Sequence, residues 1–196
     1  MCDKDFDLAF VIDGSGSIRQ AGAGNFNLMK GFIKRVIDGF NVGFDGTHVG
    51  AIIYSSPSYV KKVFGLETYY TKEAIGKAID DIQYPSGGTS TGKALERVRT
   101  QIYTSRQDRE DKPNVVIVIT DGKADDSIEG PANDLRISKE AAIFAIGVGK
   151  NFDKAELESM AGNPRYVYTA DFNDLDNVIE QIKLSACQGW RLLFLI

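Results

Sequence analysis

Short apolar runs alternate along this 196-residue chain with longer segments whose apolar residues recur every three or four positions. Unbroken apolar runs are typical of strands buried on both faces of a parallel sheet, and the longer spacing is typical of amphipathic helices. The alternation therefore predicts an α/β fold with a doubly wound, mostly parallel six-stranded sheet and helices on both faces. The six runs expected to be strands are 6–12, 48–55, 59–66, 115–119, 141–148 and 166–169.

The segments between these runs supply the helices and one hairpin. The short link Ser56-Pro57-Ser58 predicts a hairpin between the second and third strands, which places one antiparallel strand at an edge of the sheet. No linker-like segment or internal repeat divides the chain, so a single domain is expected. The expected helices are 26–40, 71–82, 94–102, 153–160 and 173–185, with a further helix-compatible stretch before residue 141.

Charge and hydropathy argue against two classes of protein. The chain has 23 Lys and Arg against 27 Asp and Glu, which gives a net charge of −4. It lacks the clustered basic residues that follow a nucleic-acid backbone, so no nucleic-acid partner is expected. It also lacks an apolar run of the roughly 18 residues that a spanning helix needs, so this segment is not expected to insert in a membrane.

The two cysteines, Cys2 and Cys187, lie near opposite ends of the chain. The ends of a domain often lie close together, so a disulfide between these residues is predicted, and it would enclose nearly the whole domain. Pairing would place the protein in an oxidising compartment. The alternative is a pair of reduced thiols in an intracellular protein.

Polar side chains gather in the loops that follow three of the expected elements. In open α/β sheets, ligands bind beyond the carboxyl ends of the strands, so these loops are where a site is expected. Asp13 comes directly after the first expected strand, and Ser15 and Ser17 follow it. Asp121 lies in the segment Thr120-Asp121-Gly122, which follows the most β-branched run of the chain. A glycine-rich loop that leads into a helix supplies Thr89.

These five side chains are two carboxylates and three hydroxyls. All are hard oxygen ligands without imidazole or thiolate, a set that suits Mg²⁺, Mn²⁺ or Ca²⁺ and disfavours Zn²⁺. Two carboxylates would neutralise a divalent ion formally, and the three weakly donating hydroxyls would leave it able to accept one more carboxylate from a partner. The residues therefore predict a metal site, with Mg²⁺ as the expected ion.

In this order and spacing, the residues resemble the metal-ion-dependent adhesion site of von Willebrand factor A domains, also called integrin I-like domains. The resemblance covers residues 5–187 and leaves 188–196 as a tail or linker stub. Around Asp125 and Asp126, the chain is most similar to A domains of the matrilin and collagen VI types. The matching segments are Phe6–Ile18, Gly87–Gly92, Val118–Lys123 and Ile146–Gly149.

The resemblance implies a role for each residue of the site. Ser15, Ser17 and Thr89 would bind the metal directly, and Asp13 and Asp121 would bind it directly or through water. The family uses the open coordination position for a Glu or Asp of the ligand. All five positions match the family pattern, so a functional metal site is expected.

The resemblance also implies a non-enzymatic adhesion module, which is extracellular, whether secreted or on a cell surface, and part of a larger multidomain protein. Its expected partner is an extracellular matrix protein, either collagen or another. Cysteines that flank the domain are similar to those of the secreted members. The alternative is an intracellular A domain that docks a partner protein in a metal-dependent ATPase or chelatase-type complex.

The remaining polar residues are given structural interpretations. The first loop lacks the sequence of a phosphate-binding loop, of a dinucleotide fingerprint and of an esterase elbow. His48 is expected at the surface or in a turn, Arg19 as a surface charge, and Asp125 with Asp126 as a solvated acidic turn rather than an extension of the metal site. Edge-strand packing is expected for Tyr54, Ser55, Ser56 and Tyr59, and a solvated helix face for Arg97, Arg99, Arg106 and Arg109.

Overall fold

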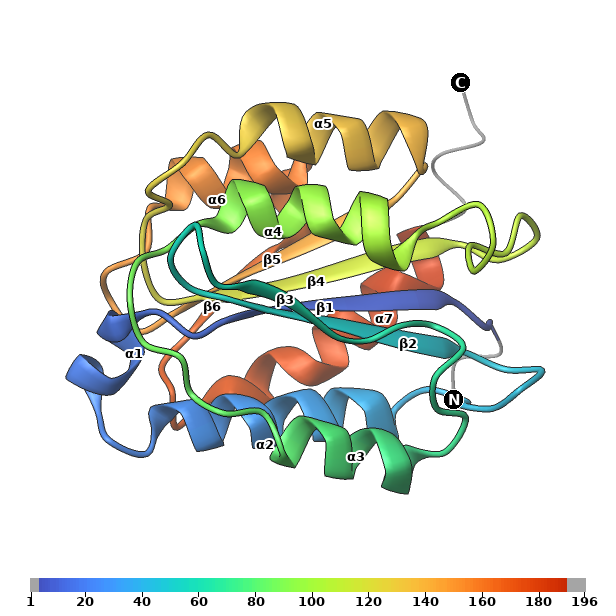
Figure 1. Ribbon diagram of the computed structural model, residues 1–196, viewed down its shortest axis with the longest axis horizontal. Helices are drawn as coiled ribbons and strands as arrows, with labels where there is room; N and C mark the ends of the chain where they lie inside the picture. Colours follow the sequence, from blue (N-terminus) through green and yellow to red (C-terminus); the bar gives the residue numbers. More distant parts are fainter. Residues whose placement is uncertain (1–3, 190–196) are drawn as a thin grey trace.

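The computed structural model describes residues 4–189, and a six-stranded sheet forms the centre of this part of the chain (Figure 1). The strand order is β3-β2-β1-β4-β5-β6; β2 and β3 are antiparallel, and the other neighbours are parallel. This confirms the predicted fold class, including the antiparallel edge strand. The strands are β1 (Asp7–Asp13), β2 (His48–Tyr54), β3 (Val60–Phe64), β4 (Asn114–Thr120), β5 (Ala142–Val148) and β6 (Val167–Ala170).

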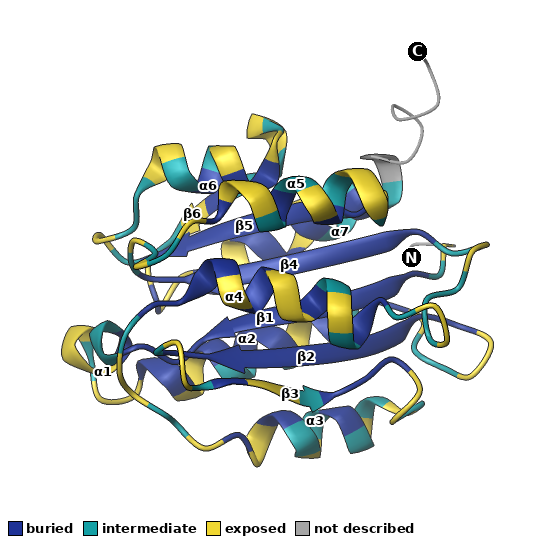
Figure 2. Ribbon diagram, turned by 45° about the horizontal axis from the view of Figure 1, so that its top comes forward, coloured by how far each residue is buried: buried dark blue, intermediate teal, exposed yellow. Residues whose placement is uncertain are grey.

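Helices cover both faces of the sheet, with α2, α3 and α7 on one face and α4, α5 and α6 on the other (Figure 1). Alternate side chains of each strand enter different cores: Phe10 of β1 packs on the α2 side, and Val11 packs on the α4 side. The central strands are therefore buried along their whole length, while the outer faces of the helices are exposed (Figure 2). This arrangement leaves polar groups of the sheet accessible mainly at its two ends.

The helices differ from the predictions mostly at their ends. The α-helices are α1 (Gly16–Ala21), α2 (Asn25–Asp38), α3 (Lys72–Asp80), α4 (Thr91–Arg97), α5 (Glu129–Ser138), α6 (Lys154–Ala161) and α7 (Ile179–Gly189). A π-helix, η1 (Val98–Ile102), continues α4, and short 3₁₀ turns, η2 (Pro164–Tyr166) and η3 (Leu175–Val178), precede β6 and α7.

Helix α1 and the π-helix η1 were not expected. Helix α1 buries one apolar side chain, Ile18, so it lacks the repeated apolar spacing that identifies a helix in sequence. Helix η1 lies where the 3–4 spacing predicted a regular helix over 94–102. The amide of Tyr103 donates to the carbonyl of Val98 at 2.9 Å, and this wider turn is invisible in the spacing of apolar residues.

Two predictions about the ends of the chain involve residues outside the described range. Cys2 and residues 190–196 belong to that part, so the Cys2–Cys187 bridge and the tail at 188–196 stay predictions. Within 4–189, no helix is both long enough and apolar enough to cross a membrane.

Candidate metal centre

Three loops meet where the parallel strands end, beside α1 in Figure 1. The first follows β1, the second follows β4, and the third joins α3 to α4. The backbone amide of Gly16 in the first loop donates to the carbonyl of Gly87 in the third at 2.9 Å. The doubly wound topology thus brings residues from distant parts of the sequence to one end of the sheet.

Four of the five predicted ligands form one hydrogen-bonded cluster. Asp13 Oδ1 accepts the amide of Ser15 at 2.7 Å. The hydroxyls of Ser15 and Ser17 lie 2.9 Å apart, and Ser17 Oγ donates to Asp121 Oδ1 at 2.6 Å. Residues from the ends of β1 and β4 are therefore held together by side-chain contacts, as the predicted site requires.

The fifth residue, Thr89, lies in the adjoining loop and is 8% exposed. The loop is fastened to the β1 turn by the Gly16–Gly87 hydrogen bond and by Tyr84, whose hydroxyl donates to the carbonyl of Ser15 at 2.5 Å. Asp125, in the loop after β4, accepts the amide of Thr89 at 2.7 Å. Thr89 is thus connected to both of the loops that carry the other four residues.

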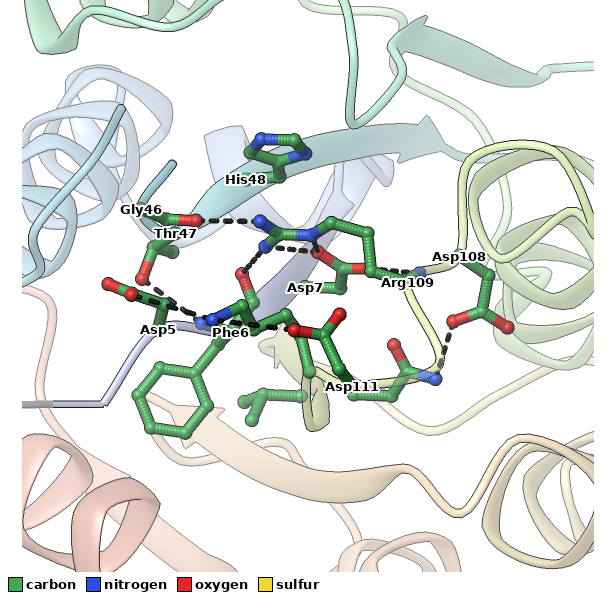
Figure 3. Close-up of polar contacts among 12 residues, drawn as sticks. Asp5, Phe6, Asp7, Gly46, Thr47, His48, Asp108, Arg109 and Asp111 are labelled. Carbon is green, nitrogen blue, oxygen red and sulfur yellow. Dashed lines mark hydrogen bonds and ion pairs between the residues drawn. The ribbon is translucent and has the colours of Figure 1, made fainter. Parts of the chain in front are cut away.

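The contrast between the two ends of β1 tests whether this site suits a cation. Asp7 and Asp13 are both fully buried. At the start of the strand, Asp7 is paired with Arg109, whose nitrogen lies 2.6 Å from Asp7 Oδ1 (Figure 3). At its end, Asp13 has only polar neutral donors, Ser15 and Thr120, and it forms no ion pair within the part of the chain that the structure describes. A buried carboxylate without a cation is costly, so this end of β1 suits an added positive charge.

The electrostatics of the carboxylates agree with that reading. The pKa of Asp13 is raised to about 6, mainly by burial and to a smaller extent by the neighbouring Asp121 carboxylate, while the hydrogen bonds from Thr120 and Ser15 oppose the rise. Burial also raises the pKa of Asp121. In addition, Asp121 Oδ2 is buried without a hydrogen-bond partner in the described chain. These two acids and three hydroxyls therefore fit a hard divalent cation.

A cation bound at this site would need hydroxyl ligands as well as carboxylates. Among residues 4–189 there is no group of three or more His, Cys, Asp or Glu side chains that could hold a metal. A cation at this site would therefore need neutral oxygen donors in addition to the two carboxylates, and the predicted ligand set stays a prediction.

Polar residues that the sequence analysis missed surround the site. Thr120 Oγ1 donates to Asp13 Oδ2 at 2.6 Å, and its position directly before Asp121 was the available signal. Tyr54 was assigned to edge-strand packing, which is wrong because β2 is an inner strand. Its buried hydroxyl accepts a hydrogen bond from Thr91 Oγ1 at 3.1 Å.

The prediction that Asp125 and Asp126 form a solvated acidic turn is also wrong, because both carboxylates accept backbone hydrogen bonds. Asp125 contacts the Thr89 backbone, and the carboxylate of Asp126 accepts the amides of Gly92 and Lys93 at the start of α4, at 2.8 and 2.9 Å. The partners of both carboxylates lie more than thirty positions away in sequence, so local sequence could not identify them.

Two predictions at the opposite end of the sheet are corrected as well. His48 is 6% exposed rather than at the surface, and its Nε2 lies 2.9 Å from the carbonyl oxygen of Phe44. Arg109 does not lie on a solvated helix face: beyond its pairing with Asp7, it donates to the carbonyls of Gly46 and Phe6 (Figure 3). Arg19, expected as a surface charge, is exposed and lies over the Tyr84 ring at 5.0 Å from its centroid.

Comparisons with known proteins converge on one family. The family model of the von Willebrand factor type A domain matches residues 7–181. The mouse collagen alpha-5(VI) chain is 35% identical over 187 residues, which cover 94% of this chain and 7% of that protein. Mouse matrilin-1 is 35% identical over 187 residues, covering 92% of this chain and 36% of that protein. The chain thus spans a minor part of each of these relatives.

A solved structure is similar over nearly the same length. Proximal thread matrix protein 1 of the mussel byssus superposes with a TM-score of 0.87 and is 36% identical, with 95% of this chain and 46% of that chain covered. That structure is described as having a zinc-occupied metal-ion-dependent adhesion site (MIDAS) motif.

Proposed function

Since the chain belongs to the von Willebrand factor type A domain family, we propose that it is an extracellular adhesion module that binds a protein ligand through a divalent cation. The observation that carries the proposal is the pairing state of the buried acids: Asp13 has no cationic partner in the described chain, and Asp121 Oδ2 has no hydrogen-bond donor there. A cation would satisfy both acids at once.

The proposed ligands are the residues of the cluster. Ser15, Ser17 and Thr89 would bind the cation through their hydroxyls, and Asp13 and Asp121 would bind it directly or through water. Thr120 holds Asp13 in place through its 2.6 Å hydrogen bond. A bound cation would supply positive charge and an open coordination position for a carboxylate of the partner.

We propose Mg²⁺ as the resident ion, with Mn²⁺ or Ca²⁺ as alternatives, because every donor is a hard oxygen. Zinc occupies the motif of the similar mussel protein, so the expectation that such a site disfavours zinc does not extend to that relative. Competition between Mg²⁺ and Zn²⁺ for this chain, followed by calorimetry, would identify the preferred ion.

The proposed partner is an extracellular matrix protein, either collagen or another, and the chain would act as one module of a larger protein. Support comes from relatives that are themselves matrix proteins and of which this chain spans a small part. We propose binding rather than catalysis, because the sole histidine, His48, lies at the end of β2 opposite the site.

The proposal is tested by binding to immobilised collagen and to a matrix extract in Mg²⁺ or in EDTA. We expect binding in Mg²⁺, and we expect EDTA, Asp121→Ala and Thr89→Ala to abolish it without unfolding the domain. Asp111→Ala, which removes an exposed acid at the other end of the sheet, is the matched control and should bind like the wild type. Binding that survives both EDTA and Asp121→Ala would contradict the cation-dependent model.

A further inference from the structure

We propose that Asp125 is a positioning residue of the metal centre, which holds Thr89 at the distance and orientation that cation binding needs. The inference rests on the proposed function, because it assigns a role in that same site. It arises from an acidic residue that sequence patterns indicated to be solvated and that the structure connects to a proposed ligand.

The loop that carries Thr89 has no regular structure to fix it. Just before Thr89, Ser86 and Gly87 both have positive φ angles, of 59° and 117°. Backbone in this region is unfavourable for Ser and is held in place by surrounding contacts. The position of the Thr89 hydroxyl therefore depends on what the neighbouring loops provide.

Asp125 binds both polar groups of the Thr89 backbone. Its Oδ2 accepts the Thr89 amide at 2.7 Å, and its own amide donates to the Thr89 carbonyl at 2.9 Å. Gly88 permits this approach, since a Cβ at that position would lie 2.7 Å from Asp125 Oδ2. The two hydrogen bonds together restrict both translation and rotation of the Thr89 peptide groups.

The same contact links two ligands that come from different loops. Asp125 follows Asp121 by four residues in the loop after β4, whereas Thr89 lies between α3 and α4. The contact therefore sets the position of Thr89 relative to Asp121. Loss of the Asp125 carboxylate would leave the loop fastened on the β1 side, through Gly87 and Tyr84. On the β4 side, the Thr89 amide would lose its acceptor, and the Thr89 carbonyl would keep its bond to the Asp125 amide.

Asp126 provides a natural comparison within the same loop. Its carboxylate accepts the amides of Gly92 and Lys93, so it stabilises the start of α4 and does not bond the Thr89 backbone directly. Both residues carry the same charge and lie side by side in sequence. A general effect of negative charge or of loop stability would therefore be seen at both positions, whereas positioning of Thr89 would be specific to Asp125.

The test measures Mn²⁺ and Mg²⁺ affinity by calorimetry for the full chain and for Asp125→Ala, Asp125→Asn and Asp126→Ala. Contacts that orient metal ligands typically change metal affinity by about 10- to 100-fold when removed, so Asp125→Ala should raise the Kd by at least about tenfold. Asp125→Asn keeps an oxygen that can accept the Thr89 amide, and we expect it to restore affinity to within about threefold of the wild type. Asp126→Ala should lower the Tm while leaving the Kd within the same range.

A metal-independent measurement accompanies the calorimetry. In the metal-free chain, amide hydrogen exchange at Thr89 should be at least about tenfold faster in Asp125→Ala and nearly normal in Asp125→Asn, because the amide loses its acceptor only in the first. Equal affinity of Asp125→Ala and the wild type would overturn the inference. So would an Asp125→Asn variant as weak as Asp125→Ala, since that result would assign the effect to charge. A wild-type chain that binds neither ion would instead overturn the proposed function. In that case the exchange measurement would still test the inference, because an unchanged exchange rate of the Thr89 amide in Asp125→Ala would refute the positioning role.

Discussion

Asp7 and Asp13 are six residues apart on one strand, but among the described residues only Asp7 is paired with a cationic side chain. Arg109 offers Asp7 its backbone amide and its guanidinium, at 2.8 and 2.6 Å. Burial raises the pKa of Asp7, and the contacts with Arg109 oppose the rise. Within residues 4–189, Asp13 receives hydrogen bonds from neutral groups alone. The first acid is thus paired within the fold, whereas the second is the one that we propose binds a cation.

The pairing of Asp7 predicts that Arg109→Ala is severely destabilising. The variant leaves a fully buried carboxylate unpaired and removes hydrogen bonds to the carbonyls of Phe6 and Gly46. Breaking a buried pair in this way typically costs about 3–5 kcal/mol in the free energy of unfolding, which urea denaturation would measure. Arg106→Ala, at an exposed position nearby, should change stability by less than about 0.5 kcal/mol. Similar losses for the two variants would contradict the assigned role of Arg109.

The raised pKa of Asp13 predicts how metal-free stability and metal affinity depend on pH. Between its ordinary value of 3.8 and about 6, the folded chain holds the proton more tightly than the unfolded chain does. The free energy of unfolding of the EDTA-treated protein should therefore fall as pH rises through this window, by up to about 3 kcal/mol. Since a proton competes with the cation for Asp13, Mg²⁺ affinity should weaken as pH falls below about 6.

Urea denaturation in EDTA at several pH values tests this dependence. Asp13→Asn is the matched variant, because it keeps the size of the side chain and removes the titration. The fall in stability between pH 4 and 6 should be smaller in the variant by the contribution of Asp13. Identical pH profiles for the two proteins would show that Asp13 does not titrate there.

Residue roles were predictable from sequence only where the partners lie in recognisable motifs. Asp13, Ser15, Ser17 and Asp121 follow strands directly, and the topology alone brings them together. Arg109 was misassigned because its partner Asp7 lies 102 positions away, and an arginine beside Asp and Glu is indistinguishable in sequence from a solvated charge. Long-range pairing of single side chains leaves no periodic signal.

At the scale of elements, apolar periodicity predicted the strands and most helices because burial dictates it. Elements that bury little or that depart from regular geometry were missed, as α1 and η1 illustrate. The π turn of η1 has a structural purpose. It brings Ile102 onto β2 and places the buried Tyr103 hydroxyl within 2.9 Å of the Asp7 carbonyl and 2.7 Å of the Val115 carbonyl.

The close contact between η1 and β2 predicts that Gly50→Ala is destabilising. A Cβ at Gly50 would lie 2.9 Å from Ile102 Cγ2, a branched methyl group close to the backbone of a buried residue. Such overpacking typically costs about 1–3 kcal/mol. Gly76→Ala, within α3, meets only ordinary contact at 3.5 Å and should stabilise the chain by about 0.5–1 kcal/mol. Thermal unfolding should show a lower Tm for Gly50→Ala and a higher Tm for Gly76→Ala. An unchanged Tm for Gly50→Ala would show that η1 shifts without cost and would contradict the prediction.

At the scale of the whole molecule, the predicted Cys2–Cys187 bridge would enclose nearly the entire domain. Intact-mass measurement of the native chain should give a mass lower by two hydrogens than that of the reduced chain. Closing a loop of this length stabilises a fold by roughly 5 kcal/mol in the chain-entropy model, so reduction should lower the Tm. In Cys187→Ala, reductant should have no further effect. Two alkylatable thiols in the native protein would contradict the bridge and favour the intracellular alternative.

The position of β1 also has a mechanical consequence. This strand lies between β2 and β4, is parallel to both, and runs from the Asp7 end of the sheet to the loop of Ser15 and Ser17. A tensile force applied between a ligand held at that loop and the start of β1 would act along the strand axis. Both hydrogen-bond ladders would then be loaded in shear, so that many bonds must break together rather than one after another. The geometry that gathers the polar loops at one end of the sheet would thus also direct such a force along a central strand that is paired on both sides.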